Sequence, residues 1–194
     1  MTLQQSIDGK INYYNDCKKH FFETYYNDVS INHCGWYNTN DQFKTYDAFL
    51  SLIDKSGNII DLGCGNGMLL KYLIDNSSFK LIPHGVDFLI KSVNEAKLSF
   101  PKFSDNFSAE NVFNFRSANK KFNYVLTSLS YVHFDHMHQY FLNCKELLNA
   151  NGRLILYEYD GSPYLKSIKD ILKKFLVENV KYIIKERAII VCIN

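Results

Sequence analysis

Three glycines and a nearby acidic residue form the stretch with the clearest chemical meaning in this chain. The segment Asp61–Gly67 reads DLGCGNG and lies between a β-rich run and a helical pattern. A glycine-rich turn from a strand into a helix brings backbone N–H groups close to a ligand and directs the positive end of the helix at it. The segment therefore predicts a ligand-binding turn, with a turn that binds nothing as the alternative.

The spacing of these glycines separates two kinds of nucleotide site. A dinucleotide fingerprint reads G-x-G-x-x-G, but here Met68 holds the third-glycine position and Gly67 comes one residue earlier. Asp87 ends the next β-rich run, where a carboxylate can accept hydrogen bonds from both hydroxyls of a ribose. Asp61 can face a cationic group, such as an α-amine or a sulfonium. The pattern predicts a nucleoside that carries such a group.

A parallel α/β sheet is the framework that would position this turn. From residue 58 onward, short β-rich runs alternate with helical patterns, which indicates repeated βα units. The expected strands are 58–62, 80–86, 106–108, 124–128, 153–159, 180–185 and 188–193. The expected helices are 45–53, 67–76, 89–98, 137–148 and 164–177. Asp135 is the expected N-cap of the helix at 137–148, and Gly152 follows at a position typical of a C-cap.

Length and composition predict one ordinary globular domain. The chain has 194 residues, of which 46% are hydrophobic and 22% charged, which excludes a disordered, collagen-like or coiled-coil chain. The net charge of +2 lacks the basic excess typical of nucleic-acid-binding domains. No apolar run approaches the roughly 20 residues that span a bilayer. The five cysteines include no C-x-x-C pair, so we expect no disulfide scaffold and no metal site, and a cytoplasmic location.

Several motifs together resemble those of class I S-adenosylmethionine-dependent methyltransferases. The stretch Asn58–Leu73 resembles their first motif, and Gly85–Asp87 resembles the second. Phe122–Ser128 resembles the fourth, and Leu147–Leu156 resembles the helix end and strand that follow. The resemblance covers residues 45–194. It implies an α/β, Rossmann-like fold with a seven-stranded, mostly parallel sheet, an antiparallel terminal hairpin, helices on both faces and a helical N-terminal arm.

The resemblance also implies S-adenosylmethionine as cofactor and assigns roles to residues at the strand ends. The glycines lie against its methionine part, Asp61 lies near its amino group, and Asp87 holds the ribose. In the third strand, Ser108 stands where an acid is usual and Glu110 follows, so either is a candidate for the adenine contact. The complete set of expected cofactor-binding residues is Asp61, Gly63, Cys64, Gly65, Asn66, Gly67, Asp87, Phe88, Ser108, Ala109, Glu110, Thr127, Ser128, Tyr14 and Trp36.

The loop after the fourth strand, residues 127–134, faces the methyl group in this family. It lacks the Asn/Asp-Pro-Pro-aromatic run of nucleic-acid amino methyltransferases and the Pro-Cys nucleophile of pyrimidine-carbon enzymes. His133 resembles the last histidine of the Leu-His-His-Phe run of small-molecule members and is the candidate catalytic base. The alternative is a helix-entry residue that only packs, because alignment alone can drive methyl transfer. His136 and His138 do not share a helix face, which argues against a metal site.

The aromatic side chains concentrate in residues 1–50, which we interpret as an arm or lid over a cofactor-binding core of residues 51–194. The alternative is that these aromatics simply pack on the sheet. Tyr14 and Trp36 are the candidates for contact with the sulfonium, because aromatic faces attract cations.

The function that fits best is methyl transfer to oxygen or nitrogen of a small molecule. Two alternatives stay open: a methyltransferase acting on tRNA or protein, and a non-catalytic S-adenosylmethionine-binding protein. A dehydrogenase is disfavoured by Met68 and by the terminal hairpin. The sequence indicates no membrane partner and no particular oligomeric state.

Overall fold

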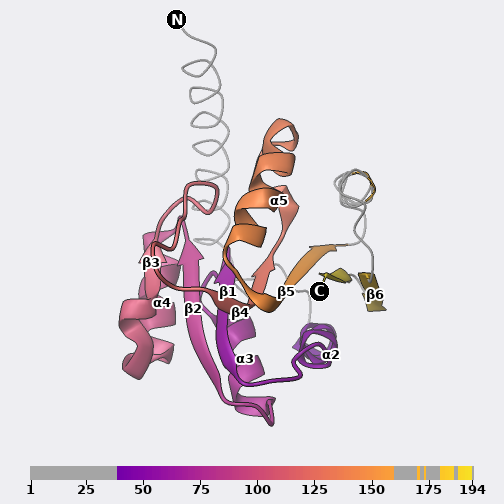
Figure 1. Ribbon diagram of the computed structural model, residues 1–194. Helices are drawn as coiled ribbons and strands as arrows, with labels where there is room; N and C mark the ends of the chain where they lie inside the picture. Colours follow the sequence, from indigo (N-terminus) through magenta and orange to yellow (C-terminus); the bar gives the residue numbers. More distant parts are fainter. Residues whose placement is uncertain (1–38, 160–169, 171–172, 174–179, 186–187, 194) are drawn as a thin grey trace, which may run out of the picture.

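One β-sheet organises the part of the chain that the computed structural model describes, which is residues 39–159, 170, 173, 180–185 and 188–193. Its strand order is β3-β2-β1-β4-β5-β7-β6 (Figure 1). The strands are β1 (Gly57–Leu62), β2 (Leu81–Asp87), β3 (Phe107–Ala109), β4 (Phe122–Thr127), β5 (Leu148–Tyr159), β6 (Val180–Lys185) and β7 (Ala188–Ile193). The pairs among β1 to β5 are parallel, whereas β7 is antiparallel to both of its neighbours.

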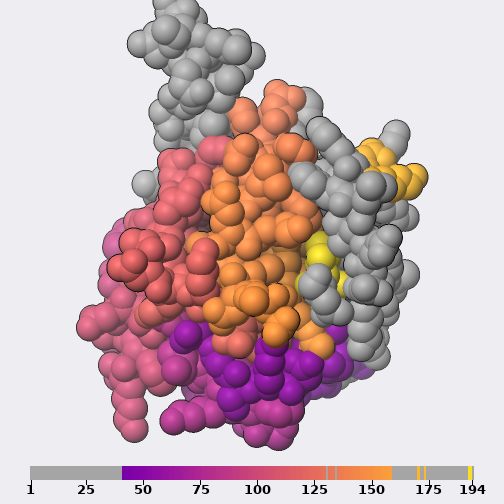
Figure 2. All heavy atoms as spheres, in the orientation of Figure 1, coloured from indigo at the N-terminus to yellow at the C-terminus, as the bar shows by residue number. Residues whose placement is uncertain are grey.

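Helices cover both faces of this sheet. The helices are α2 (Thr39–Leu50), α3 (Met68–Asn76), α4 (Ile90–Ser99) and α5 (Met137–Glu146). Strand residues Ile59, Leu126 and Ile155 point to the face that carries α2, α3 and α4. Their neighbours Ile60 and Val125 point to the opposite face, where α5 packs. Figure 2 shows the face with α5 in front. Because the central strands are buried on both sides, they read as nearly continuous apolar runs in the sequence.

The expected Rossmann-like α/β architecture is therefore confirmed, and the two terminal strands have the predicted bounds. Residues 1–38 of the predicted arm, with Tyr14 and Trp36, lie outside the described residues, as does most of the expected helix at 164–177. The last part of the arm forms α2, which begins earlier than expected. Tyr46 and Phe49 of α2 are buried in the core, which agrees with packing on the sheet for these two aromatics.

The two expected caps of α5 are wrong. Asp135 lies in a short 3₁₀ turn, Phe134–His136, and His136 occupies the N-cap position without a side-chain hydrogen bond. Gly152 lies inside β5 rather than after the helix. A Cβ built on Gly152 would lie 2.7 Å from the backbone oxygen of Phe122 on β4, so the glycine permits close approach of these two strands. The place of Gly152 is decided by the pairing of β4 with β5, and helix-capping rules do not take strand pairing into account.

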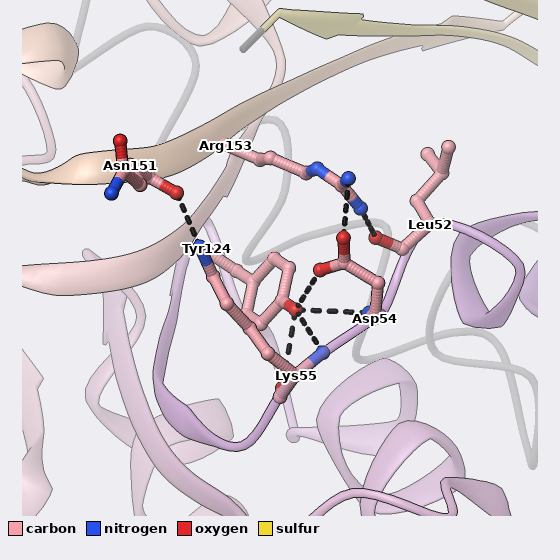
Figure 3. A network of polar contacts seen from close by, with 6 residues as sticks. All are labelled: Leu52, Asp54, Lys55, Tyr124, Asn151 and Arg153. Atoms are coloured by element: carbon pink, nitrogen blue, oxygen red, sulfur yellow. Dashed lines mark hydrogen bonds and ion pairs between the residues drawn. The ribbon is translucent and has the colours of Figure 1, made fainter.

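A polar network fixes the edge of the sheet where β1 and β4 begin (Figure 3). Arg153 of β5 contacts the Asp54 carboxylate at 2.5 Å and donates to the backbone oxygen of Leu52 at 2.7 Å. The phenol oxygen of Tyr124 accepts hydrogen bonds from the backbone N–H groups of Asp54 and Lys55. The network joins the connection between α2 and β1 to β4 and β5, and it leaves the opposite edge of the sheet available for chemistry.

A buried histidine in β2 makes the fold sensitive to acid. His84 is 5% exposed, its ring packs edge-on against Phe122 at 5.1 Å, and its Nε2 has no hydrogen-bond partner among the described residues. Burial, with a smaller contribution from Lys120, lowers the pKa of His84 from 6.5 to about 4. Between these pH values the unfolded chain binds a proton that the folded chain excludes.

We therefore expect His84 to lower the free energy of unfolding as the pH falls from about 6.5 to about 4, by at most about 3 kcal/mol. The measurement is urea unfolding of the wild type and of His84→Leu across this range. The difference between them should change with pH by that amount, whereas the carboxyl groups affect both proteins alike. His138→Gln, a histidine on α5 that is not fully buried, is the control. An unchanged difference between pH 7 and pH 4 would contradict the assignment.

Candidate functional site

The carboxyl ends of the central strands form one row. In the sheet register Leu62 lies beside Val86 and Thr127, Val86 beside Ser108, and Thr127 beside Leu156. The turn after β1 and the segments that follow β2, β3 and β4 therefore meet at the same edge of the sheet (Figure 1). Open α/β sheets bind their ligands at this edge. The described residues of the predicted cofactor set all belong to these strand ends or to the turns that follow them.

The turn after β1 is held against β2 and is open on one side. The backbone N–H of Gly63 donates to the Val86 oxygen at 2.7 Å. Gly63 and Gly65 have φ angles of 96° and 52°, in the left-handed region that favours glycine. A Cβ built on Gly63 would lie 2.2 Å from the ring of Tyr131, whereas one built on Gly65 would meet no atom within 4 Å. The Gly65 side of the turn can therefore admit a ligand close to the backbone.

The other residues of the turn shape its exit into α3. The N–H of Gly67 donates to the Cys64 oxygen at 2.9 Å, which closes the turn. The side-chain oxygen of Asn66 accepts from the N–H of Met68, the first residue of α3, at 3.3 Å. Cys64 is buried beneath the surface of the protein. These contacts fix the start of α3, whose positive end lies at the same edge as the strand ends.

Asp87 ties the end of β2 to the glycine turn. Its carboxylate is 6% exposed, and the two oxygens accept from the N–H groups of Gly65 and Leu89, each at 2.9 Å. Burial raises the pKa of Asp87, and hydrogen bonds to the backbone oppose this shift. The backbone N–H of Phe88 also bonds to this carboxylate, and since a carboxylate has about four acceptor sites, it can still accept from a hydroxyl group. Asp87 thus lies directly beside the open side of Gly65.

Asp61 lies on the adjacent strand, β1. It is 2% exposed, and its Oδ1 has no hydrogen-bond partner among the described residues. Burial, and secondly the charge of Asp87, raise the pKa of Asp61 from 3.8 to about 8. Two ionised carboxylates buried close together repel each other, and burial itself disfavours their charges. A cation between or beside them would offset both the repulsion and the cost of burial. The pair is therefore suited to a ligand that carries a positive group.

The segments after β2 and β3 border the same place. Phe88 follows Asp87 and is half-buried. Ser108 is half-buried, whereas Ala109 and Glu110 are exposed. The backbone N–H of Glu110 donates to the backbone oxygen of Asp87 at 2.9 Å, so the backbone after β3 is fixed to the end of β2. Both candidates for the adenine contact therefore lie near Asp87, and the choice between Ser108 and Glu110 stays open.

At the end of β4 the two predicted residues have different surroundings. The Thr127 hydroxyl donates to the Leu62 oxygen at 3.2 Å and lies 2.7 Å from the Tyr140 hydroxyl of α5. Its side chain is fully buried on the α5 face, so a ligand would meet only its backbone. The Ser128 hydroxyl donates to a carboxylate oxygen of Glu158 at 2.8 Å. Ser128 is therefore linked to the end of β5.

His133 lies in the turn between Leu129–Tyr131 and Phe134–His136. Its Nδ1 is 3.4 Å from a carboxylate oxygen of Asp135, and a third of its side chain is exposed. In the described part of the chain, no group of His, Cys, Asp or Glu side chains could hold a metal ion. None of the helices described there is long and apolar enough to cross a membrane.

Two features of this edge were missed by the sequence reasoning. The ring of Tyr131 covers the first glycine of the turn, and its hydroxyl lies 2.8 Å from that of Tyr157. Glu158 is a buried acid at the end of β5. An acid directly after the apolar run of the fifth strand was the signal for Glu158. Nothing in the sequence signals that Tyr131 lies over Gly63, because this contact depends on the turn after β4.

Comparison with known proteins agrees with this arrangement. Residues 37–183 match a family described as a methyltransferase domain. No curated protein sequence matches the chain. Among solved structures, phosphoethanolamine N-methyltransferase 1 of Haemonchus contortus, in complex with phosphoethanolamine and S-adenosylhomocysteine, has a TM-score of 0.65 and 17% identity. That match covers 77% of this chain and 33% of the other, so the chain spans about a third of the worm enzyme.

Two bacterial structures are similar over most of their length. The ribosomal protein L11 methylase of Lactobacillus delbrueckii subsp. bulgaricus has a TM-score of 0.62 at 14% identity, over 82% of this chain and 80% of that one. The N-methyltransferase NodS of Bradyrhizobium japonicum, in complex with S-adenosylhomocysteine, has a TM-score of 0.61 at 14% identity. That match covers 78% of this chain and 85% of NodS. At such identities the similarity shows the fold.

Proposed function

Because this chain belongs to the methyltransferase-domain family and has the class I fold, we propose that it transfers the methyl group of S-adenosylmethionine to oxygen or nitrogen of a small molecule. Family membership implies S-adenosylmethionine as the methyl donor. When bound, this cofactor supplies a methyl carbon that is already activated by the positive sulfur. The protein then needs chiefly to hold the donor and align an acceptor with it.

One observation carries the proposal: two buried acids end neighbouring strands on either side of a glycine turn that is open at Gly65. We propose that Asp87, beside Gly65, accepts hydrogen bonds from the two ribose hydroxyls. The open space at Gly65 lets a ligand lie close to the backbone of the turn. Asp61, whose Oδ1 lacks a partner among the described residues, is suited to the amino group of the methionine part. A dinucleotide offers no cationic group at this place to match Asp61.

The small-molecule acceptor is supported by the sequence rather than by the fold. The loop 127–134 lacks the nucleic-acid motifs, and the net charge of +2 gives little attraction for a polyanion. Phosphoethanolamine in the worm enzyme is a small acceptor on the same fold, whereas the L11 methylase acts on a protein. We propose His133 as a base that accepts the proton of the acceptor, since it lies in the loop that follows β4.

Calorimetry tests the cofactor assignment. We expect S-adenosylhomocysteine to bind with a micromolar or lower Kd and NAD to show no heat of binding. Formation of S-adenosylhomocysteine from S-adenosylmethionine is then measured with small amines, alcohols and acids, with tRNA, and with ribosomal protein. Binding of NAD in place of S-adenosylhomocysteine would overturn the proposal. Turnover confined to tRNA or protein would favour the macromolecular alternative, and binding without any turnover would favour a non-catalytic protein.

A further inference from the structure

An aromatic ring from the segment after β4 lies directly against the glycine turn after β1. Tyr131 ends the short 3₁₀ turn Leu129–Tyr131 and is half-buried. Three atoms of its ring would lie 2.2–2.9 Å from a Cβ built on Gly63, so the ring has room only because this residue is a glycine. Tyr131 therefore forms one wall of the sheet edge where we propose that the cofactor binds.

Two further aromatic rings fix Tyr131 in this place. Its hydroxyl lies 2.8 Å from that of Tyr157, and the two rings meet edge-on with their centroids 6.3 Å apart. Tyr157 is 6% exposed and packs edge-on against Phe49 of α2 at 5.3 Å. Tyr157 and Phe49 belong to the core on the α2 side of the sheet. Asp61 points to that same side, because it lies two residues after the core residue Ile59.

The contacts proposed for the cofactor bring its sulfur past this ring. In S-adenosylmethionine the sulfur joins the ribose to the amino-acid part. We propose that the ribose is held by Asp87, beside Gly65, and the amino group by Asp61. Gly63 lies between Asp61 and Gly65 in the chain, and the ring of Tyr131 lies against Gly63. A ligand that reaches both acids therefore carries its sulfur past the ring.

We propose, on the basis of the proposed function, that the ring of Tyr131 contacts the sulfonium and makes the site prefer S-adenosylmethionine to S-adenosylhomocysteine. The face of an aromatic ring attracts a cation. In the transfer step the acceptor forms a bond to the methyl carbon as the carbon–sulfur bond breaks. The electron pair of that bond stays on the sulfur, which becomes a neutral thioether. The attraction to Tyr131 is therefore lost when the product forms, and this favours release of the product.

The variant Tyr131→Leu tests this inference by calorimetry with each compound in the absence of an acceptor. Leucine can still pack against a methyl group, so a change in relative affinity reports the charge. We expect the ratio of the Kd for S-adenosylmethionine to that for S-adenosylhomocysteine to rise at least about fivefold over the wild type. Tyr131→Phe keeps the ring and should stay within about twofold. Tyr72→Leu, which removes a half-buried aromatic of α3 that contacts Asp47, is the control and should leave the ratio unchanged.

A second series changes the charge distribution of the ring with little change in its shape. Phenylalanine with one, two or three fluorine atoms is incorporated at position 131. Fluorine withdraws electrons from the face of the ring and so weakens its attraction for a cation. The Kd ratio should rise with each added fluorine, whereas the Kd for S-adenosylhomocysteine should change by less than about twofold. A residue that only supports the fold would not give this dependence.

The possible results separate this inference from the proposed function. An unchanged ratio in Tyr131→Leu, or a ratio that does not follow the number of fluorines, would overturn the inference and leave the proposed function intact. Tighter binding of both compounds by Tyr131→Leu would show that the ring occupies the place of the ligand, and would also overturn it. Failure of the wild type to bind either compound would overturn the proposed function as well.

Discussion

Replacing Asp61 by asparagine is expected to stabilise the ligand-free protein. The pKa of Asp61 is raised from 3.8 to about 8, mainly by burial. At neutral pH the folded chain therefore holds a proton that the unfolded chain releases, and stability falls as the pH rises from about 4 to about 8. At pH 7 this costs up to about 4 kcal/mol. Asparagine is neutral at every pH, so the free energy of unfolding at pH 7 should rise by about 2–4 kcal/mol.

Urea unfolding at several pH values checks this expectation. The advantage of Asp61→Asn over the wild type should be small near pH 4 and should grow up to pH 8. Asp105→Asn, at an exposed position before β3, is the control and should show no such trend. An advantage that is absent, or that does not change with pH, would show that Asp61 is not held protonated by its surroundings.

The same substitution should weaken ligand binding. An ammonium group beside Asp61 favours the ionised carboxylate, so binding of S-adenosylhomocysteine at pH 7 should release a proton from the wild type. In calorimetry this release makes the heat of binding depend on the ionisation enthalpy of the buffer. Asp61→Asn should lose that dependence and bind at least tenfold more weakly. A residue that raises affinity while lowering stability is typical of a functional site.

Most of the strands were predictable because they carry a local signal, whereas β5 begins at Leu148, five residues before the predicted strand. The run Asn58–Leu62 is apolar on both faces of a parallel sheet, and the terminal strands flank a charged turn, so their bounds follow from the sequence. The glycine turn and Asp87 were predictable for a similar reason, since their spacing fixes a strand, a turn and a helix in order. Their placement in one row then follows from the parallel register.

The features that escaped prediction depend on contacts between distant segments. Gly152 has the spacing of a helix stop, but it lies inside β5, where it approaches the backbone oxygen of Phe122 closely. Thr127 lies within the fourth motif, yet its side chain faces α5 because strand residues alternate between the two faces. Tyr131 meets Gly63 only through the turn after β4. No local pattern encodes such contacts, so a sequence can indicate the edge of the sheet that binds without indicating which side chains line it.

Replacing Asp87 by alanine is expected to weaken binding of S-adenosylhomocysteine about a thousandfold. Two hydroxyl hydrogen bonds to a charged, buried acceptor contribute about 4 kcal/mol together, which corresponds to that factor. The variant also removes the acceptor for the N–H groups of Gly65 and Leu89, so part of any loss arises from the turn itself. Affinity for one compound does not separate these two causes.

A second compound separates them. An S-adenosylhomocysteine analogue whose ribose lacks both hydroxyls should bind the wild type about a thousandfold more weakly than the parent compound, because it leaves Asp87 without its partners. Asp87→Ala should bind the two compounds equally, since the hydroxyls then have no acceptor to lose. The affinities for the two compounds give one ratio in the wild type and another in Asp87→Ala. Dividing the first ratio by the second gives the coupling between Asp87 and the hydroxyls, and any general disturbance of the turn cancels from it. If the wild type does not distinguish the two compounds, Asp87 does not hold the ribose, and its role is confined to fixing the N–H groups of the turn.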